Sequence, residues 1–180
     1  MNDRELFETY REHVYRFCRY MMHSEADAED ICQEVFVKAM LADRSQIREL
    51  KPWLLRIASN ECMTILQRRR KGHHKEKLVY LLSLTKRQAQ VEENWENAET
   101  KGELERLLGQ LSVPIRSAIL LRYSGDLSIA ETAEVLGIAE GTVKSRVNRG
   151  LRILRRMFNE SRDEIEPEGD WKWLSATKNK

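Results

Sequence analysis

The sequence has little glycine and proline, and it has no long apolar run. Its 180 residues include 8 Gly and 3 Pro, too few for the many turns of an all-β chain, so we expect a helix-rich protein. No apolar run approaches the length that spans a bilayer, and the charged N-terminus, MNDRELFETYREH, is unlike a signal peptide. These absences predict a cytoplasmic protein with one domain or two small ones.

Motifs for catalysis and for metal binding are also missing. Cys18, Cys32 and Cys62 are far apart, odd in number and outside any CxxC pair, so we expect buried, reduced thiols. The adjacent His73 and His74 lack further ligands nearby, which favours a solvated loop over a metal site. Neither a Gly-rich phosphate loop nor a nucleophile elbow is present. The sequence therefore predicts no enzyme, no cofactor and no metal site.

Charge is nearly balanced over the whole chain but not locally. There are 31 Lys and Arg against 29 Asp and Glu. Residues 25–34 carry five acids and no base, whereas the charged residues of 68–71 and of 141–156 are all basic. We expect these patches, rather than the total of +2, to govern which partners the protein binds.

Apolar spacing predicts helices in most of the chain. Three are expected in a first unit: Ser24 caps the second of them, and Pro52 lies in the first turn of the third. Gly72 is expected to end this unit, and residues 73–98 to form a linker with at most a short helix.

A second helical unit is expected over residues 99–160, followed by a charged tail over 161–180. Within this unit, Ser128 and Glu131 predict a capping box at the start of a short helix, IAETAEVL. Gly137 is expected to end that helix. After a short turn, a long basic helix begins at about residue 141.

Two helices joined by such a turn describe a helix-turn-helix, whose second helix enters the DNA major groove. Lys or Arg donates to guanine, Asn pairs with adenine, and distal arginines reach phosphate. A solvated surface helix normally mixes charge signs, so six bases without an acid favour DNA binding. The residues predicted to contact DNA are Thr142, Lys144, Ser145, Arg146, Asn148, Arg149 and Arg152.

Three segments together resemble the extracytoplasmic-function (ECF) sigma factors of bacterial RNA polymerase. They are DAEDICQEVFVKA (27–39), PWLLRIASNECMTILQRRRK (52–71) and LSIAETAEVLGIAEGTVKSRVNRGLRILRR (127–156). The resemblance implies an all-α fold of two small helical domains on a flexible linker. The helical-bundle σ2 domain would cover residues 1–72, and the helix-turn-helix σ4 domain residues 99–160.

The first segment looks like the polymerase-binding helix of this family. Its acids form a negative helix face that suits a basic partner helix, although acids at a helix start can also merely solubilise it. The resemblance implies that the partner is the coiled coil of the β′ clamp. The residues that would bind it are Asp30, Gln33, Glu34 and Phe36.

The second segment looks like the part of the family that binds the −10 promoter element. Opening DNA requires pockets or stacking platforms for unpaired bases, together with cations for the backbone. The polar loop 42–51 can form such a pocket, whereas Trp53 at a helix start is more typical of core packing than of base stacking. Ser59 and Thr64 stand where the family often has Arg and Asp. The predicted −10 contacts are Arg48, Lys51, Trp53, Arg56, Asn60, Arg68, Arg69 and Arg70.

The resemblance implies a transcription initiation factor that binds core RNA polymerase, recognises the −35 and −10 elements and helps to melt the −10 region. It also implies that σ4 touches the β flap, that the linker threads into the enzyme, and that an anti-sigma factor regulates a chain that is monomeric when free. Two alternatives remain open. One is a dimeric helix-turn-helix regulator, and the other is an interaction or redox-sensing module that uses the three cysteines.

Overall fold

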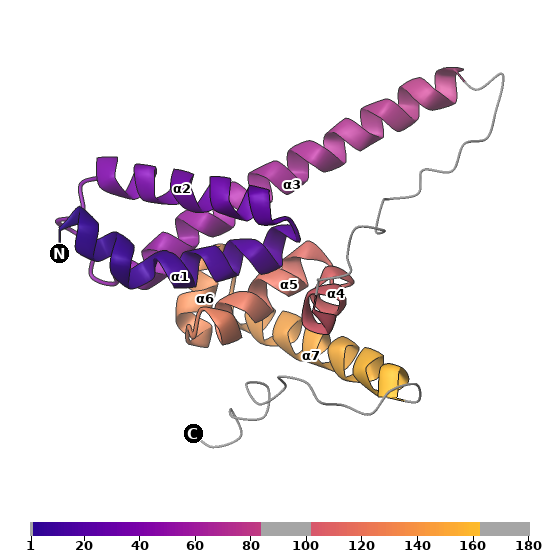
Figure 1. The fold of residues 1–180 in the computed structure, drawn as a ribbon. Helices are drawn as coiled ribbons and strands as arrows, with labels where there is room; N and C mark the ends of the chain where they lie inside the picture. Colours follow the sequence, from indigo (N-terminus) through magenta and orange to yellow (C-terminus); the bar gives the residue numbers. More distant parts are fainter. Residues whose placement is uncertain (1, 84–101, 163–180) are drawn as a thin grey trace.

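The computed structural model describes residues 2–83 and 102–162, and every regular element in these residues is a helix. The helices are α1 (Asp3–Met22), α2 (Glu25–Leu41), α3 (Leu50–Ser83), α4 (Glu103–Gly109), α5 (Val113–Ile119), the π-helix η1 (Leu120–Ser124), α6 (Ile129–Leu136) and α7 (Glu140–Arg162). The predicted all-α fold of two helical units is therefore confirmed (Figure 1). Most of the predicted linker and tail lies outside the described residues.

The predicted caps fix where the helices begin and end. The Ser24 hydroxyl accepts a hydrogen bond from the Asp27 amide at the start of α2. At the start of α6, the Ser128 hydroxyl accepts from the Glu131 amide at 3.1 Å, and the Ser128 amide donates to the Glu131 carboxylate at 2.7 Å. Gly137 ends α6 in the left-handed region, with φ of 63°, where a side chain would be strained.

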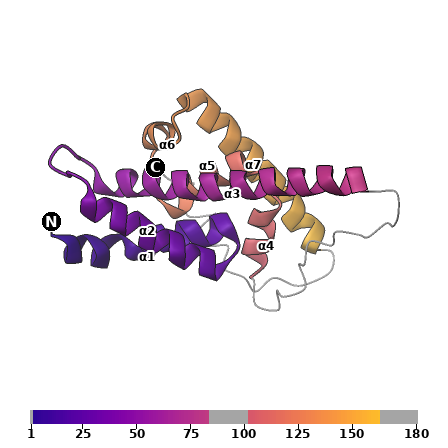
Figure 2. The same cartoon turned by 90° about the horizontal axis from the view of Figure 1, so that it is seen from above.

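The third helix is longer than the sequence predicted. α3 runs through Gly72 to Ser83, so the predicted helix end at Gly72 is wrong, and His73 and His74 lie on a helix instead of in a loop. One glycine inside a helix costs about 1 kcal/mol relative to alanine, and no proline follows it before Ser83. Figure 2 shows α3 extending past the other helices. Residues 84–98 of the predicted linker lie outside the described residues.

The two units pack against each other along α1 and α3. The first unit consists of α1, α2 and α3, and the second of α4 to α7. Elements of the second unit contact both α1 and α3, while α2 lies on the far side of α1 from α5, α6 and α7 (Figure 1). One apolar core contains Phe17, Leu55 and Leu121, which come from both units and are fully buried.

α7 crosses α5 at Gly150, where the two helices lie too close for a side chain. A Cβ on Gly150 would lie 2.7 Å from Cγ2 of Ile115 and would also clash with Cδ1 of Ile119. Both isoleucines are buried, and Cγ2 is attached directly to a β-branched Cβ that has little freedom to move. The close approach brings α7 against the core of the second unit.

We predict that Gly150→Ala lowers the free energy of unfolding by about 1–3 kcal/mol, because the added methyl group overpacks the crossing. Gly141→Ala is the matched control, since nothing lies within 4 Å of a Cβ at that position. Urea unfolding followed by circular dichroism measures both variants. Equal stability of the two variants would contradict the close crossing of α5 and α7.

Candidate nucleic-acid interface

α7 presents a basic face to solvent and an apolar face to the second unit. Val143 and Val147 are buried and pack in one cluster with Ala118 of α5 and Ala133 of α6. Of the residues predicted to contact DNA, Arg146 is half-buried and the others are exposed. The exposed ones are Thr142, Lys144, Ser145, Asn148, Arg149 and Arg152. The structure therefore holds this helix by one side and leaves the predicted DNA-contacting side accessible.

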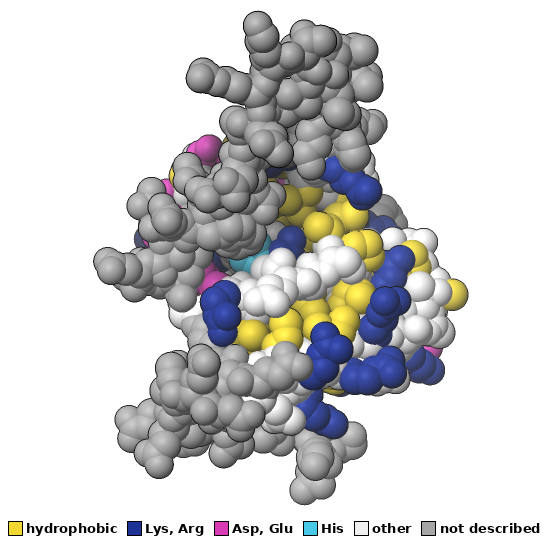
Figure 3. Space-filling view, turned by 90° about the vertical axis from the view of Figure 1, so that its right-hand side faces the viewer, with side chains coloured by type: hydrophobic (Ala, Val, Ile, Leu, Met, Phe, Trp, Pro, Cys, Tyr) yellow, Lys and Arg dark blue, Asp and Glu magenta, His cyan; other side chains and the backbone are white. Residues whose placement is uncertain are grey.

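The cationic surface continues along the second half of α7. Figure 3 shows the face on the right-hand side of Figure 1, where Lys and Arg clearly predominate over Asp and Glu. Arg149, Arg152 and Arg155 are exposed on α7. Phosphate groups would bind such a surface and displace its counterions. The arrangement fits a helix that reads bases near its start and contacts the DNA backbone further along.

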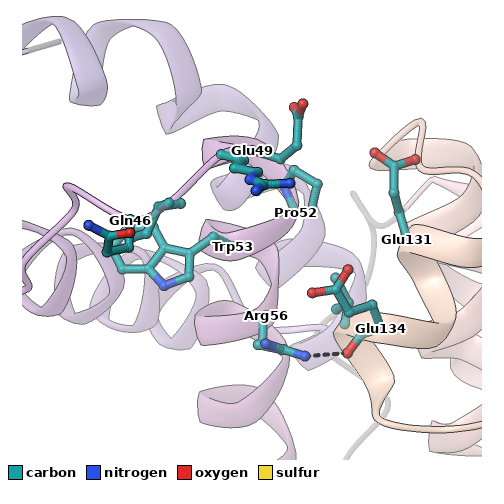
Figure 4. Close-up of a pocket in the computed structure, with 10 residues that line it drawn as sticks. Gln46, Glu49, Pro52, Trp53, Arg56, Glu131 and Glu134 are labelled. Carbon is teal, nitrogen blue, oxygen red and sulfur yellow. Dashed lines mark hydrogen bonds between the residues drawn. The ribbon is translucent and has the colours of Figure 1, made fainter.

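The predicted −10 residues fall into two groups along α3 and the loop before it. In the first group, Arg48, Trp53 and Arg56 line a cavity of about 390 Å³ (Figure 4). The segment from Gln46 to Glu49 forms one wall of this cavity, so the polar loop does border a pocket. Trp53 is half-buried and also packs against the core. The indole therefore packs against the core and also lines the cavity.

The second group lies further along α3. Asn60, Arg68 and Arg70 are exposed, whereas Arg69 donates a hydrogen bond to the Asp27 carboxylate of α2 at 2.7 Å. This bond holds the pKa of Asp27 below its ordinary value. Arg69 therefore ties α3 to α2, and about half of its side chain stays exposed to a ligand.

The positions that depart from the family pattern lie on this same helix. Ser59 is 2% exposed and belongs to the core side of α3. Thr64 is exposed, and its hydroxyl donates to the Asn60 carbonyl at 2.8 Å. Thr64 therefore offers a hydroxyl that is already engaged with its own helix, where a carboxylate would reach solvent.

The far wall of the cavity comes from the second unit, which the sequence analysis did not foresee. It consists of Glu131, Glu134 and Val135 of α6. The Arg56 guanidinium donates to the Glu134 carbonyl oxygen at 2.6 Å. Hydrogen bonds from Ser128 hold the pKa of Glu131 below its ordinary value, and the charge of Lys51 adds to the effect. Three predicted −10 residues, Arg48, Trp53 and Arg56, thus line the same cavity as α6, and the charge of a fourth, Lys51, acts on Glu131.

The predicted polymerase-binding residues of α2 differ in accessibility. Asp30, Gln33 and Glu34 are exposed. Phe36 is only 2% exposed and packs edge-on against the ring of Phe7, with 4.9 Å between ring centroids. Phe36 therefore fills the core and does not offer the surface contact that the resemblance implied.

Other apolar side chains of α2 are exposed instead, and the sequence analysis missed them. Val37, Met40 and Leu41 lie on the surface, with Leu41 83% exposed. Val37 and Leu41 follow Gln33 at four-residue spacing, which places all three on one side of the helix. Lys38 forms ion pairs with Glu34 and with Glu61 of α3. An apolar strip beside carboxylates is a typical protein-binding surface.

The three cysteines are free and buried, as predicted. Burial raises the pKa of Cys32 to about 11. The hydrogen bond with Cys62, together with burial, raises the pKa of Cys18 as well. In the part of the chain that the structure describes, no three His, Cys, Asp or Glu side chains gather to hold a metal ion.

A helix that crosses a membrane must be both long and apolar. Within residues 2–83 and 102–162, no helix meets that requirement.

Comparisons with known proteins agree with both units. The model of Sigma-70 region 2 matches residues 6–72, and that of Sigma-70, region 4 matches residues 101–154. The fold and its surfaces therefore define a two-domain factor of the sigma-70 class, with region 2 in the first unit and region 4 in the second.

Comparison with individual relatives identifies the group within the sigma-70 class to which the chain belongs. It is 34% identical over 156 residues to the ECF RNA polymerase sigma factor SigM of Mycobacterium tuberculosis, covering 86% of this chain and 76% of the relative. It is 27% identical over 165 residues to SigW of Bacillus subtilis, covering 87% and 88% of the two chains. The chain belongs to the ECF sigma factors of RNA polymerase.

Solved structures share the fold. One is the sigma factor RpoE in complex with the anti-sigma factor NepR from Bartonella quintana, with a TM-score of 0.69 and 22% identity over 87% of this chain and 96% of that one. Another is CnrH in complex with the cytosolic domain of CnrY, with a TM-score of 0.61 and 23% identity over 88% of each chain.

We predict that the native thiols resist alkylation. With a pKa of about 11, Cys32 is ionised in roughly one molecule in a thousand at pH 8, and only the thiolate reacts. Iodoacetamide at pH 8, followed by mass spectrometry, should modify all three cysteines in urea and leave them largely unmodified in the native protein. Rapid labelling of the native protein would favour the redox-sensing alternative instead.

Proposed function

We propose that this chain binds core RNA polymerase and directs it to promoters whose −35 and −10 elements it recognises. The observation that carries the proposal is the division of α7 into a buried apolar face and an exposed basic face. A basic face held in this way on a helix-turn-helix is built for the major groove. The polymerase performs the chemistry, and this chain chooses the site.

The −35 element would be read by α7 in the second unit, which serves as the σ4 domain. Lys144, Asn148 and Arg152 share one face at four-residue spacing, with Ser145 and Arg149 beside them. These side chains are exposed and supply the donors and acceptors that distinguish guanine and adenine in the major groove. We also propose that this domain touches the β flap of the polymerase.

The −10 element would be melted by the first unit, which serves as the σ2 domain. Asn60, Arg68 and Arg70 offer exposed polar and cationic groups along α3. The cavity beside Arg48 and Trp53 offers space for an unpaired base. Because α3 continues past Gly72, the linker that threads into the polymerase would begin with a helical segment.

The polymerase itself would bind the exposed side of α2. Asp30 and Glu34 suit a basic partner helix, and Val37 and Leu41 provide the apolar contact that the buried Phe36 does not. The partner would be the coiled coil of the β′ clamp. Binding becomes more favourable when a partner buries large apolar side chains that are exposed in the free chain.

An anti-sigma factor is proposed as the regulator of this chain. Among the solved structures that share its fold, one is a sigma factor in complex with an anti-sigma factor, and another is CnrH in complex with the cytosolic domain of CnrY. We propose that the chain is a monomer when free and that such a protein binds it in the cell.

In vitro transcription with core polymerase and a promoter library tests the proposal. Adding the purified chain should start RNA synthesis at a subset of promoters that core polymerase alone does not use. Gel filtration and a polymerase pull-down distinguish this proposal from the dimeric-regulator alternative, which predicts a dimer that does not bind polymerase. No gain of initiation at any promoter would reject the proposed function.

We predict that Arg149→Ala weakens −35 recognition by about tenfold, since one good base contact contributes about 1–3 kcal/mol of discrimination. Transcription from a promoter with an intact −35 element measures the loss, while a pull-down shows polymerase binding unchanged. Arg4→Ala is the control, because Arg4 is an arginine of α1 that is 87% exposed. Equal loss of both activities would contradict separate binding surfaces.

We predict that Leu41→Ser weakens binding to core polymerase by about tenfold, as loss of one apolar anchor typically does. The free energy of unfolding should not fall, because Leu41 is 83% exposed. Fluorescence anisotropy of labelled chain against core polymerase gives the affinity. Glu8→Ala on α1 serves as the control, and an unchanged affinity for Leu41→Ser would remove α2 from the interface.

A further inference from the structure

The cavity between the two units is closed on one side by proposed DNA-binding residues and on the other by an acidic helix. Arg48, Trp53 and Arg56 line it from the first unit, and Glu131 and Glu134 from α6. Figure 4 shows the hydrogen bond from Arg56 to the main-chain carbonyl oxygen of Glu134 on α6. The surface proposed to bind −10 DNA is therefore partly occupied by another part of the same chain.

We infer that α6 acts as a built-in competitor of −10 DNA: in the free chain its acidic end occupies the cations of the first unit that the proposed function assigns to the DNA backbone. The inference rests on the proposed function, because it requires those cations to be a DNA-binding surface. It assigns to Glu131 and Glu134 a role that neither a cap nor a helix-turn-helix requires.

The end of α6 offers the chemistry that a DNA phosphate offers. The Glu134 carbonyl belongs to the last turn of α6, where it accepts a hydrogen bond from the Gly137 amide at 3.3 Å and where the macrodipole is negative. Arg56 donates to this oxygen at 2.6 Å. Glu131 and Glu134 lie three residues apart, on one side of the helix, and α6 carries no basic residue. The acidic end of α6 thus meets cations at the start of α3.

The charge of the first unit acts on the acidic side chains of α6. The Lys51 charge helps to hold the pKa of Glu131 below its ordinary value, so this carboxylate is ionised at neutral pH and attracts the lysine. Arg48 and Arg56 are both exposed in spite of lining the cavity. Electrostatic contacts of exposed charges are weak, and DNA phosphates can therefore compete with α6 for these cations.

Other contacts between the units also indicate an arrangement that can separate. The Arg116 side chain of α5 is 5% exposed, its contact is with the ring of His23, and its Nε has no hydrogen-bond partner. Burial lowers its pKa to about 10. Arg19 and Glu105 form an ion pair at 3.4 Å, and each leaves one buried polar atom unsatisfied. Buried polar groups without partners destabilise the closed form.

The test measures how tightly the free chain binds a fluorescent single-stranded oligonucleotide at low salt. Glu134→Lys should tighten binding by about threefold to tenfold relative to Glu8→Lys, because it replaces a carboxylate that lines the cavity together with Arg48 and Arg56 by an ammonium group that repels them. Glu8→Lys makes the same change of charge on an exposed site of α1. The double variant Glu131→Gln/Glu134→Gln should tighten binding less, and Gln at 131 keeps the capping box.

A double-mutant cycle excludes a trivial effect of the added lysine. If Glu134→Lys acts by freeing the cations of the first unit, its gain should shrink in an Arg56→Ala background. If the new lysine simply binds DNA, the gain persists unchanged, and the inference is overturned. Equal affinities of Glu134→Lys and Glu8→Lys overturn it too.

Transcription with core polymerase distinguishes a failure of the inference from a failure of the proposed function. When Glu134→Lys and Glu8→Lys bind the oligonucleotide equally but both direct initiation, the competition by α6 fails and the proposed function stands. When no form of the chain directs initiation, the proposed function is rejected, and the inference that rests on it is rejected as well.

Discussion

The apolar contact of η1 with α1 and α3 is the constraint on which the arrangement of the two units depends. Leu55 of α3 and Leu121 of η1 are fully buried in a core that both units share. A Cβ on Gly125 would lie 3.0 Å from Cδ1 of Leu55 and 2.7 Å from the Leu121 carbonyl oxygen, so only glycine fits there. Units of this size bury little surface alone, and sharing a core adds stability that the weak polar contacts between α3 and α6 do not provide.

Local signals predicted much of this fold, while contacts between the units had no local signal. Ser24, the Ser128–Glu131 box and Gly137 act within one turn of chain, and the structure confirms each. The contact of Arg56 with Glu134 joins residues 78 positions apart, and no periodicity encodes it. The burial of Phe36 could be predicted from the sequence, because helical spacing places this residue on the buried side of α2. α3 continues past Gly72 because a single glycine destabilises a helix much less than a proline does, so Gly72 alone is a weak signal for a helix end.

The closed arrangement affects the three proposed binding surfaces differently. The acidic and apolar side of α2 stays exposed, with Leu41 the most accessible of its large apolar side chains. The basic face of α7 also stays exposed. Only the loop and the start of α3 meet another part of the chain. The surfaces proposed to bind polymerase and duplex DNA are therefore accessible, and the surface proposed to bind unpaired DNA is the one that meets α6.

The first unit takes part in two kinds of interface, which differ in how completely their buried polar groups are hydrogen-bonded. Where α1, α2 and α3 meet, the interior is apolar and includes three buried, free cysteines, Cys18, Cys32 and Cys62. Where α1 meets α4 and α5, the buried surface includes the guanidinium of Arg116 without a full set of partners. Polar, imperfectly satisfied interfaces are typical of domains that move relative to each other. The shared leucines favour the packed arrangement of the two units, and the buried guanidinium of Arg116, whose hydrogen bonds are incomplete, opposes it.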